Sequence, residues 1–142
     1  MTSQQLALLQ ARSRIAVGAA LVTFPRLAAR TWIGPDASRK PVTVLARGLG
    51  IRDLALGLGV AIALDRDAPV RGWLEACALC DVVDLLATLV AGEAISESAR
   101  RGVIAVAGGS AALCTALSRT LDQPSSPVDV HAPEAALTGH PA

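Results

Sequence analysis

The chain has 142 residues, of which 52% are hydrophobic and 18% are charged, and its formal net charge is +1. This length allows one domain, and the balanced charge argues against binding to nucleic acid. The mean hydropathy of +0.48 is high for a water-soluble domain. With two Trp, one Phe and no Tyr, the chain lacks the aromatic bulk of a water-soluble core. This composition favours membrane helices, which pack through small residues.

Four apolar segments follow one another, each about the length that a bilayer requires. They cover residues 5–24, 42–64, 72–92 and 102–118. Pro25 is predicted to end or kink the first helix, and residues 26–32 are predicted to form an interfacial turn. Because the connections are short, neighbouring helices are expected to be antiparallel. The predicted fold is all-α: a four-helix transmembrane bundle of up-down topology, formed by residues 1–118.

Residues 119–142 are rich in proline and poor in large apolar residues, which is typical of a disordered tail. The two histidines, His131 and His140, both lie in this tail. Cys77 and Cys80 have no second cysteine pair beside them, and cysteine also packs well between helices. The sequence therefore predicts no metal site and no cofactor.

Lysines and arginines in the loops predict orientation, because they favour the cytoplasmic side of a membrane. The loops after the first and third helices hold Arg26, Arg30, Arg39, Lys40, Arg100 and Arg101. The opposite side holds Arg66, Arg71 and Arg119, and also Arg12 and Arg14 when these are counted. We therefore expect both termini to lie outside the cytoplasm, in a multi-pass protein of the cell membrane.

Three carboxylates lie inside the second and third apolar segments: Asp53, Asp81 and Asp84. A carboxylate at membrane depth costs several kcal/mol unless it is paired, so each one, together with Arg52, is a candidate catalytic residue. The alternative is that these residues form ion pairs that fix helix packing. The arginines available as partners are Arg12, Arg14, Arg47 and Arg52. We expect Asp81 or Asp84 to lie within salt-bridge reach of an arginine from the first or second helix.

The second helix has small residues on two faces when it is laid out at 100° per residue. One face carries Ala46, Gly50, Asp53, Gly57 and Ala61, and a roughly opposite face carries Gly48, Arg52, Ala55 and Gly59. Since small residues let backbones approach closely, we expect this helix to be contacted on both faces.

The chain carries several short motifs: Arg14-x-x-x-Gly18, Pro25, Trp32-Ile33-Gly34 and Arg47-Gly48-x-Gly50-Ile51-Arg52-Asp53-Leu54-x-Leu56-Gly57. Over about residues 10–118 the chain resembles a group of uncharacterised small bacterial membrane proteins that are loosely similar to DoxX-like proteins. The Gly-x-Arg-Asp stretch is the most specific part of this resemblance. It implies a four-helix membrane fold and marks Arg52, Asp53 and Asp84, but it implies no activity.

Three interpretations of function remain. The first is a non-enzymatic accessory or scaffold subunit in the lipid bilayer, as a homo-oligomer or part of a larger membrane complex. The second is a membrane-embedded enzyme, an acid/base cyclase, isomerase or hydrolase, acting on a lipophilic small molecule. Asp53, Asp81 and Asp84 would then act as acid and base, and Arg52 would orient the substrate or stabilise charge. A cleft lined by all three carboxylates would favour this interpretation. The third is a proton-coupled carrier that titrates Asp53 or Asp84. A water-soluble four-helix bundle is the alternative fold.

Overall fold

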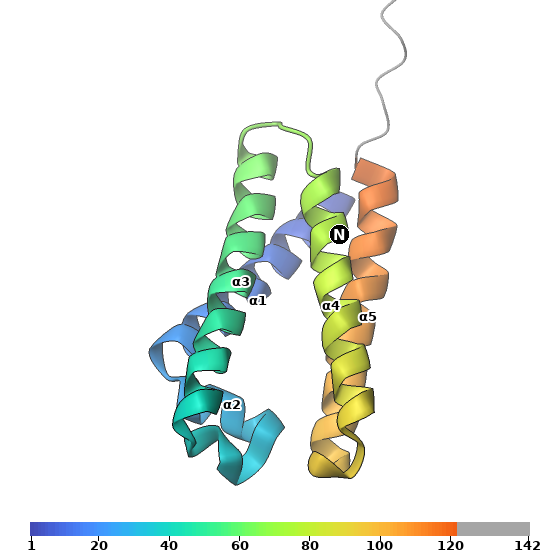
Figure 1. Ribbon diagram of the computed structural model, residues 1–142. Coiled ribbons are helices and arrows are strands. Elements are labelled where there is room, and N and C mark those ends of the chain that lie inside the picture. The colour runs from blue at the N-terminus through green and yellow to red at the C-terminus, as the bar shows by residue number, and fades with distance from the viewer. Residues whose placement is uncertain (122–142) are drawn as a thin grey trace, which may run out of the picture.

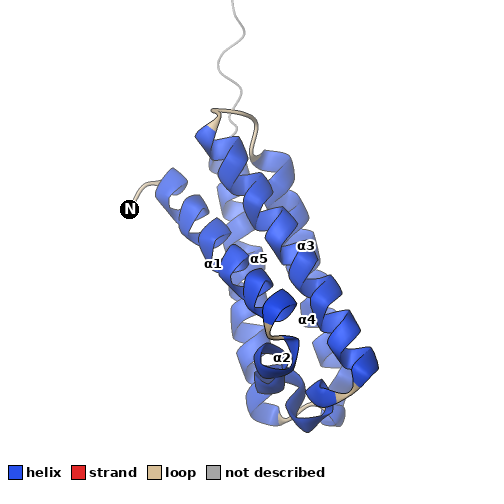
Figure 2. Cartoon of the chain, turned by 90° about the vertical axis from the view of Figure 1, so that its left-hand side faces the viewer, coloured by secondary structure: helices blue, strands red, loops and turns tan. Residues whose placement is uncertain are grey.

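Four long helices alternate in direction along one axis of the computed structural model (Figure 1). They are α1 (Ser3–Thr23), α3 (Lys40–Asp65), α4 (Arg71–Ala91) and α5 (Glu97–Leu121). A shorter helix, α2 (Pro25–Ile33), and the 3-10 turn η1 (Gly34–Ser38) link α1 to α3, while η2 (Gly92–Ala94) links α4 to α5. The structure describes residues 1–121, and within them every regular element is a helix (Figure 2). The all-α prediction is therefore confirmed for this part of the chain.

Two of the sequence predictions are wrong, one about an element and one about where a helix ends. The expected interfacial turn at residues 26–32 is an α-helix, so the described chain holds α2 in addition to the four predicted helices. Pro25 begins α2, because a helix tolerates proline in its first turn, where the missing N–H has no partner to lose. At the other end, α5 continues to Leu121, so residues 119–121 are helical and do not belong to the predicted tail. The rest of the predicted tail, 122–142, lies outside the described residues.

The helices form two antiparallel pairs, α1 with α3 and α4 with α5. Glycines bring α1 and α3 into backbone contact. A Cβ added at Gly18 would lie 2.6 Å from the carbonyl oxygen of Gly50, and a Cβ added at Gly57 would lie 2.8 Å from that of Ala11. The predicted face of α3 that carries Gly50 and Gly57 therefore packs on α1.

The opposite face of α3 is contacted only in part. The ring of Trp73, from α4, packs directly on Gly59. Gly48 and Ala55 on the same face are exposed, and a Cβ at Gly48 would meet no atom within 4 Å. Arg52, also on this face, bonds to Asp84 of α4. The expectation that both faces are contacted therefore holds fully for the first face, and for the second face at Gly59 and Arg52 but not at Gly48 and Ala55.

A shared core joins the two pairs at the end that holds the N-terminus. It is built mainly from small side chains: Ala7, Ala11, Ala63, Cys77, Ala78 and Cys114, with Val60, Val70, Leu74 and Leu117. Many other large apolar side chains lie on the outside, such as Val90, which is 87% exposed, and Val106, which is 73% exposed. This distribution is unusual for a water-soluble monomer, which rarely exposes extended apolar surface.

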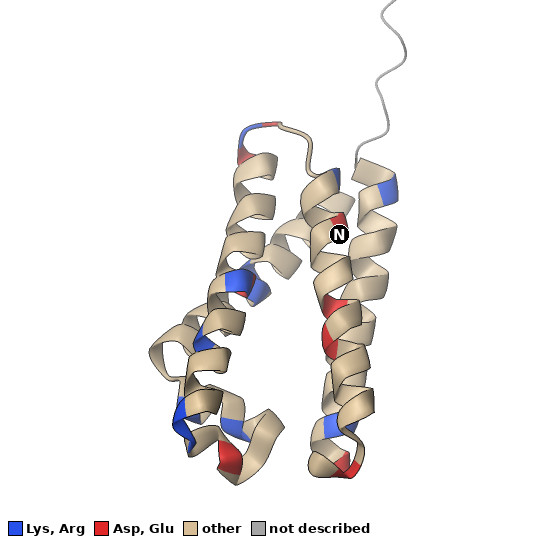
Figure 3. Cartoon of the chain, in the orientation of Figure 1, with Lys and Arg blue, Asp and Glu red and all other residues tan. Residues whose placement is uncertain are grey.

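Most charged residues lie at the two ends of the bundle or in one band about halfway along it, where α3 faces α4 (Figure 3). Arg47 lies outside these places, within α3. By length and composition, α1 and α5 are each able to cross a membrane. Both α3 and α4 carry more charge, including Arg52 and Asp53 on one and Asp81 and Asp84 on the other. Two of the four predicted spans are thus supported by composition, and a multi-pass arrangement stays a prediction.

Candidate functional site

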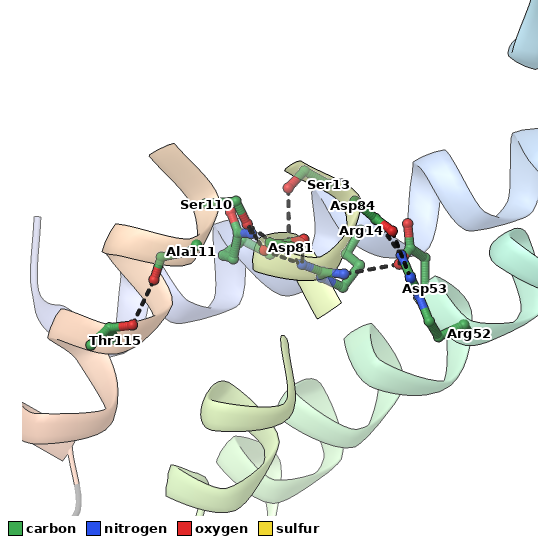
Figure 4. A network of polar contacts seen from close by, with 10 residues as sticks. Ser13, Arg14, Arg52, Asp53, Asp81, Asp84, Ser110, Ala111 and Thr115 are labelled. Atoms are coloured by element: carbon green, nitrogen blue, oxygen red, sulfur yellow. Dashed lines mark hydrogen bonds and ion pairs between the residues drawn. The ribbon is translucent and has the colours of Figure 1, made fainter. Parts of the chain in front are cut away.

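Arg14, on α1, lies at the centre of the charged band (Figure 4). Its Nη1 donates to Asp53 Oδ1 of α3 at 2.9 Å, and its Nη2 lies 2.6 Å from both carboxylate oxygens of Asp81 on α4. All three side chains are buried, with Arg14 only 7% exposed. One guanidinium therefore bridges three helices and both helix pairs.

Arg52 makes the second half of the network. Its Nη1 and Nη2 donate to the two oxygens of Asp84 at 3.0 and 2.7 Å, a bidentate pair between α3 and α4. The same Nη2 lies 3.1 Å from Asp53 Oδ1. Because Asp53 Oδ1 accepts from both arginines, the five side chains form one continuous chain, in the order Asp81, Arg14, Asp53, Arg52, Asp84.

The predicted salt bridges are confirmed. Asp81 pairs with Arg14 of α1, the first predicted helix, and Asp84 pairs with Arg52 of α3, the second predicted helix. The structure brings all four candidate residues into one cluster. Whether any of them is catalytic stays a prediction.

Two members of the cluster were not among the sequence candidates. Arg14 was one of four arginines that were equally available as partners. Ser110 on α5 donates to Asp81 Oδ2 at 2.5 Å and also bonds to Gln10 of α1. In the sequence, Ser110 stands out only as a hydroxyl within residues 102–118, the predicted span without a charged residue. This is weak evidence for a role in a polar site, because serine also occurs in membrane helices as a small packing residue.

The other arginines considered as partners do not join the network. Arg12 is exposed on the far side of α1. Arg47 donates its Nε to the carbonyl oxygen of Val22 at 3.3 Å. Two guanidinium groups therefore face three carboxylates, so the network carries one negative charge in excess when all five groups are ionised.

Hydrogen bonding in the network is incomplete on both sides. The Nε–H groups of Arg14 and Arg52 are buried and have no partner among the described residues. Asp53 Oδ2 likewise accepts no hydrogen bond within residues 1–121, although Oδ1 accepts two. The exposed fraction of the Asp53 side chain, 13%, shows that the carboxylate is not sealed off completely.

A cavity of about 910 Å³ lies beside the network, between α1, α2 and α5. Asp53, Asp81, Asp84 and Arg14 form its charged floor. Its walls are mainly apolar and include Val17, Leu21, Leu49, Val103, Val106 and Leu113. Volumes of about 300–1,000 Å³ are typical of pockets for drug-sized molecules. The cavity therefore has the size and composition of a site for a lipophilic small molecule.

Within residues 1–121, no group of three or more His, Cys, Asp or Glu side chains is placed to hold a metal ion. Cys77 and Cys114 are buried in the core that α4 and α5 share, and Cys80 is half-buried. Cys77 and Cys114 pack there as small apolar side chains.

No protein-family model matches the chain, and no curated protein or solved structure is similar enough to be matched. The resemblance to DoxX-like proteins therefore stays a prediction.

Proposed function

We propose that the protein is a small integral membrane protein whose four long helices cross the bilayer, and that it acts as a non-enzymatic scaffold or accessory subunit. The observation that carries this proposal is the pairing of every candidate carboxylate. Asp53, Asp81 and Asp84 each accept hydrogen bonds from a guanidinium on another helix. Such contacts hold helices together and leave few carboxylate lone pairs for a substrate.

The placement of charge supports insertion of α3 and α4 as well as α1 and α5. The charges at mid-helix turn toward each other, so the outer surfaces of α3 and α4 carry apolar side chains. Exposed examples are Val44, Leu45, Ile51, Leu58 and Ile62 on α3, and Leu79, Val83, Leu86, Leu89 and Val90 on α4. Paired polar groups that face the interior of a bundle are the arrangement in which membrane helices tolerate charge.

The distribution of basic residues supports an orientation. Arg26, Arg30, Arg39 and Lys40 lie in or beside the α1–α3 connection, at the end of the bundle where α4 turns into α5. This end is proposed to face the cytoplasm, with the N-terminus on the other side.

Alkaline carbonate extraction of cell membranes tests the membrane assignment. An integral protein is expected to stay in the membrane pellet after the carbonate wash and to be released by detergent. A peripheral protein of known behaviour, released by the same wash, is the control. Recovery of the protein in the carbonate supernatant would favour the water-soluble bundle and contradict the proposal.

A membrane-embedded enzyme acting on a lipophilic substrate is the second candidate, because all three carboxylates line the cavity. Thermal stability in detergent separates the two roles. If the network is a structural clamp, Asp81→Asn is expected to lower the Tm, because it weakens the bond that Arg14 makes across the helix pairs. An Asp81→Asn variant that keeps the parental Tm would favour the enzyme instead.

A further inference from the structure

We infer that the cavity beside the network binds a lipophilic organic monocation, such as an aryl phosphonium or a quaternary ammonium. This inference goes beyond the proposed scaffold role. It is tested on purified protein in detergent, so its outcome is separate from that of the membrane-extraction experiment.

The network carries more negative than positive charge. The network holds the guanidinium groups of Arg14 and Arg52 against three carboxylates, and the other arginines near it bond elsewhere or face outward. An uncompensated charge is costly in a bundle of low dielectric. A bound monocation would balance the excess charge.

Among the described residues, Asp53 Oδ2 is the one carboxylate oxygen of the network without a hydrogen-bond partner. Asp53 is nine-tenths buried, lines the cavity, and has Oδ2 without a hydrogen-bond partner among residues 1–121. The unpaired donors nearby, Arg14 Nε and Trp32 Nε1, are covered by neighbouring atoms. A ligand in the cavity can therefore meet the unpaired oxygen of Asp53, whereas the N–H groups of Arg14 Nε and Trp32 Nε1 are not accessible to it.

The walls of the cavity are mainly apolar and include one aromatic ring. Aliphatic side chains from α1 and α5 surround the floor, and Trp32 of α2 also lines the cavity. Aliphatic walls stabilise an apolar body, and the face of a tryptophan ring attracts an organic cation more strongly than any other side-chain ring. A small, strongly hydrated metal ion would gain nothing from such walls, whereas a large cation with its charge spread over an apolar body would.

Isothermal titration of the purified full-length protein with tetraphenylphosphonium tests the inference, with empty micelles as the blank. Saturable binding of one cation per chain is expected. Tetraphenylborate has the same shape and the opposite charge, and it is expected to bind at least about tenfold more weakly, because the carboxylates repel it.

Two variants locate the site. Asp53→Asn removes the excess charge at nearly constant volume and is expected to weaken binding by about tenfold or more. Asp65→Asn removes the same charge at the exposed end of α3 and is its control. Gly102→Leu places bulk in the cavity, because Gly102 lines it and a Cβ there meets no atom within 4 Å.

Gly108→Leu is the control for Gly102→Leu. Gly108 lies on the same helix, and a Cβ there would also meet no atom within 4 Å, but Gly108 does not line the cavity. The network stays intact in Gly102→Leu, so this variant keeps the inference testable even if Asp53→Asn fails to fold. Binding that is lost in Gly102→Leu and kept in Gly108→Leu supports the inference. The inference is overturned by the absence of saturable phosphonium binding, by equal binding of tetraphenylborate, or by unchanged affinity in Gly102→Leu.

Discussion

Replacing Arg14 with alanine is the perturbation to which the bundle should be most sensitive. The change removes the contacts of 2.9 Å to Asp53 and 2.6 Å to Asp81, and it leaves two buried carboxylates without their shared guanidinium. Removing one partner of a buried ion pair typically costs about 3–5 kcal/mol. We expect Arg14→Ala to lower the free energy of unfolding by that amount, measured by circular dichroism during unfolding in mixed detergent micelles.

Arg12→Ala is the matched control, because Arg12 lies two residues away on the same helix, is exposed and forms no ion pair among the described residues. Its effect is expected to stay within about 0.5 kcal/mol. A double-mutant cycle of Arg14→Ala with Asp81→Ala is expected to give a coupling energy of about 1–3 kcal/mol. Additive effects in this cycle, or an Arg14→Ala loss no larger than that of Arg12→Ala, would refute the clamp.

Two further predictions concern packing and orientation. Gly50→Ala is expected to lower the free energy of unfolding by about 1–3 kcal/mol, because the added Cβ would lie 2.8 Å from the carbonyl oxygen of Gly18. Gly48→Ala is the control: its Cβ would meet no atom within 4 Å, so it is expected to be neutral or mildly stabilising. Equal stability of these two variants in detergent would show that α1 does not pack on this face of α3. The C-terminus is proposed to lie outside the cytoplasm. Alkaline phosphatase, which is active only outside the cytoplasm, is therefore expected to be active when it is fused after residue 142. Green fluorescent protein, which fluoresces only inside, is expected to be dark at the same position. The reverse pair of signals would invert the assignment.

Much of the fold follows from periodicity in the sequence. The lengths of the apolar segments predict the four long helices, and the small residues around Gly50 and Gly57 predict the face of α3 that packs on α1. The sequence predicts a turn over residues 26–32 because proline commonly ends a helix, whereas Pro25 also begins the next helix, α2. Local sequence signals do not separate these two uses of proline.

The sequence predicts that the buried carboxylates are paired, but it does not predict which residues pair with them. Buried carboxylates require partners, so pairing of Asp81 and Asp84 followed from their position in apolar segments. The choice of Arg14 over Arg12 did not follow, because the two lie about 200° apart around α1 and only the rotation of α1 against α3 decides which points inward. Ser110 joins the network through the packing of α5 on α4, a long-range contact that no periodicity within α5 reveals.

The central claim is that the Arg/Asp network holds the α1–α3 unit to the α4–α5 unit. The most direct test is to co-express residues 1–67 and 68–142 as separate chains and to measure how much of the second chain is recovered from membranes with an affinity-tagged first chain. The double variant Asp81→Asn and Asp84→Asn is expected to reduce this recovery at least about tenfold, because it removes both carboxylates that bond across the pairs. Glu75→Gln, on the exposed surface of α4, is expected to leave recovery unchanged. Equal recovery of the double variant and the parent would contradict the account.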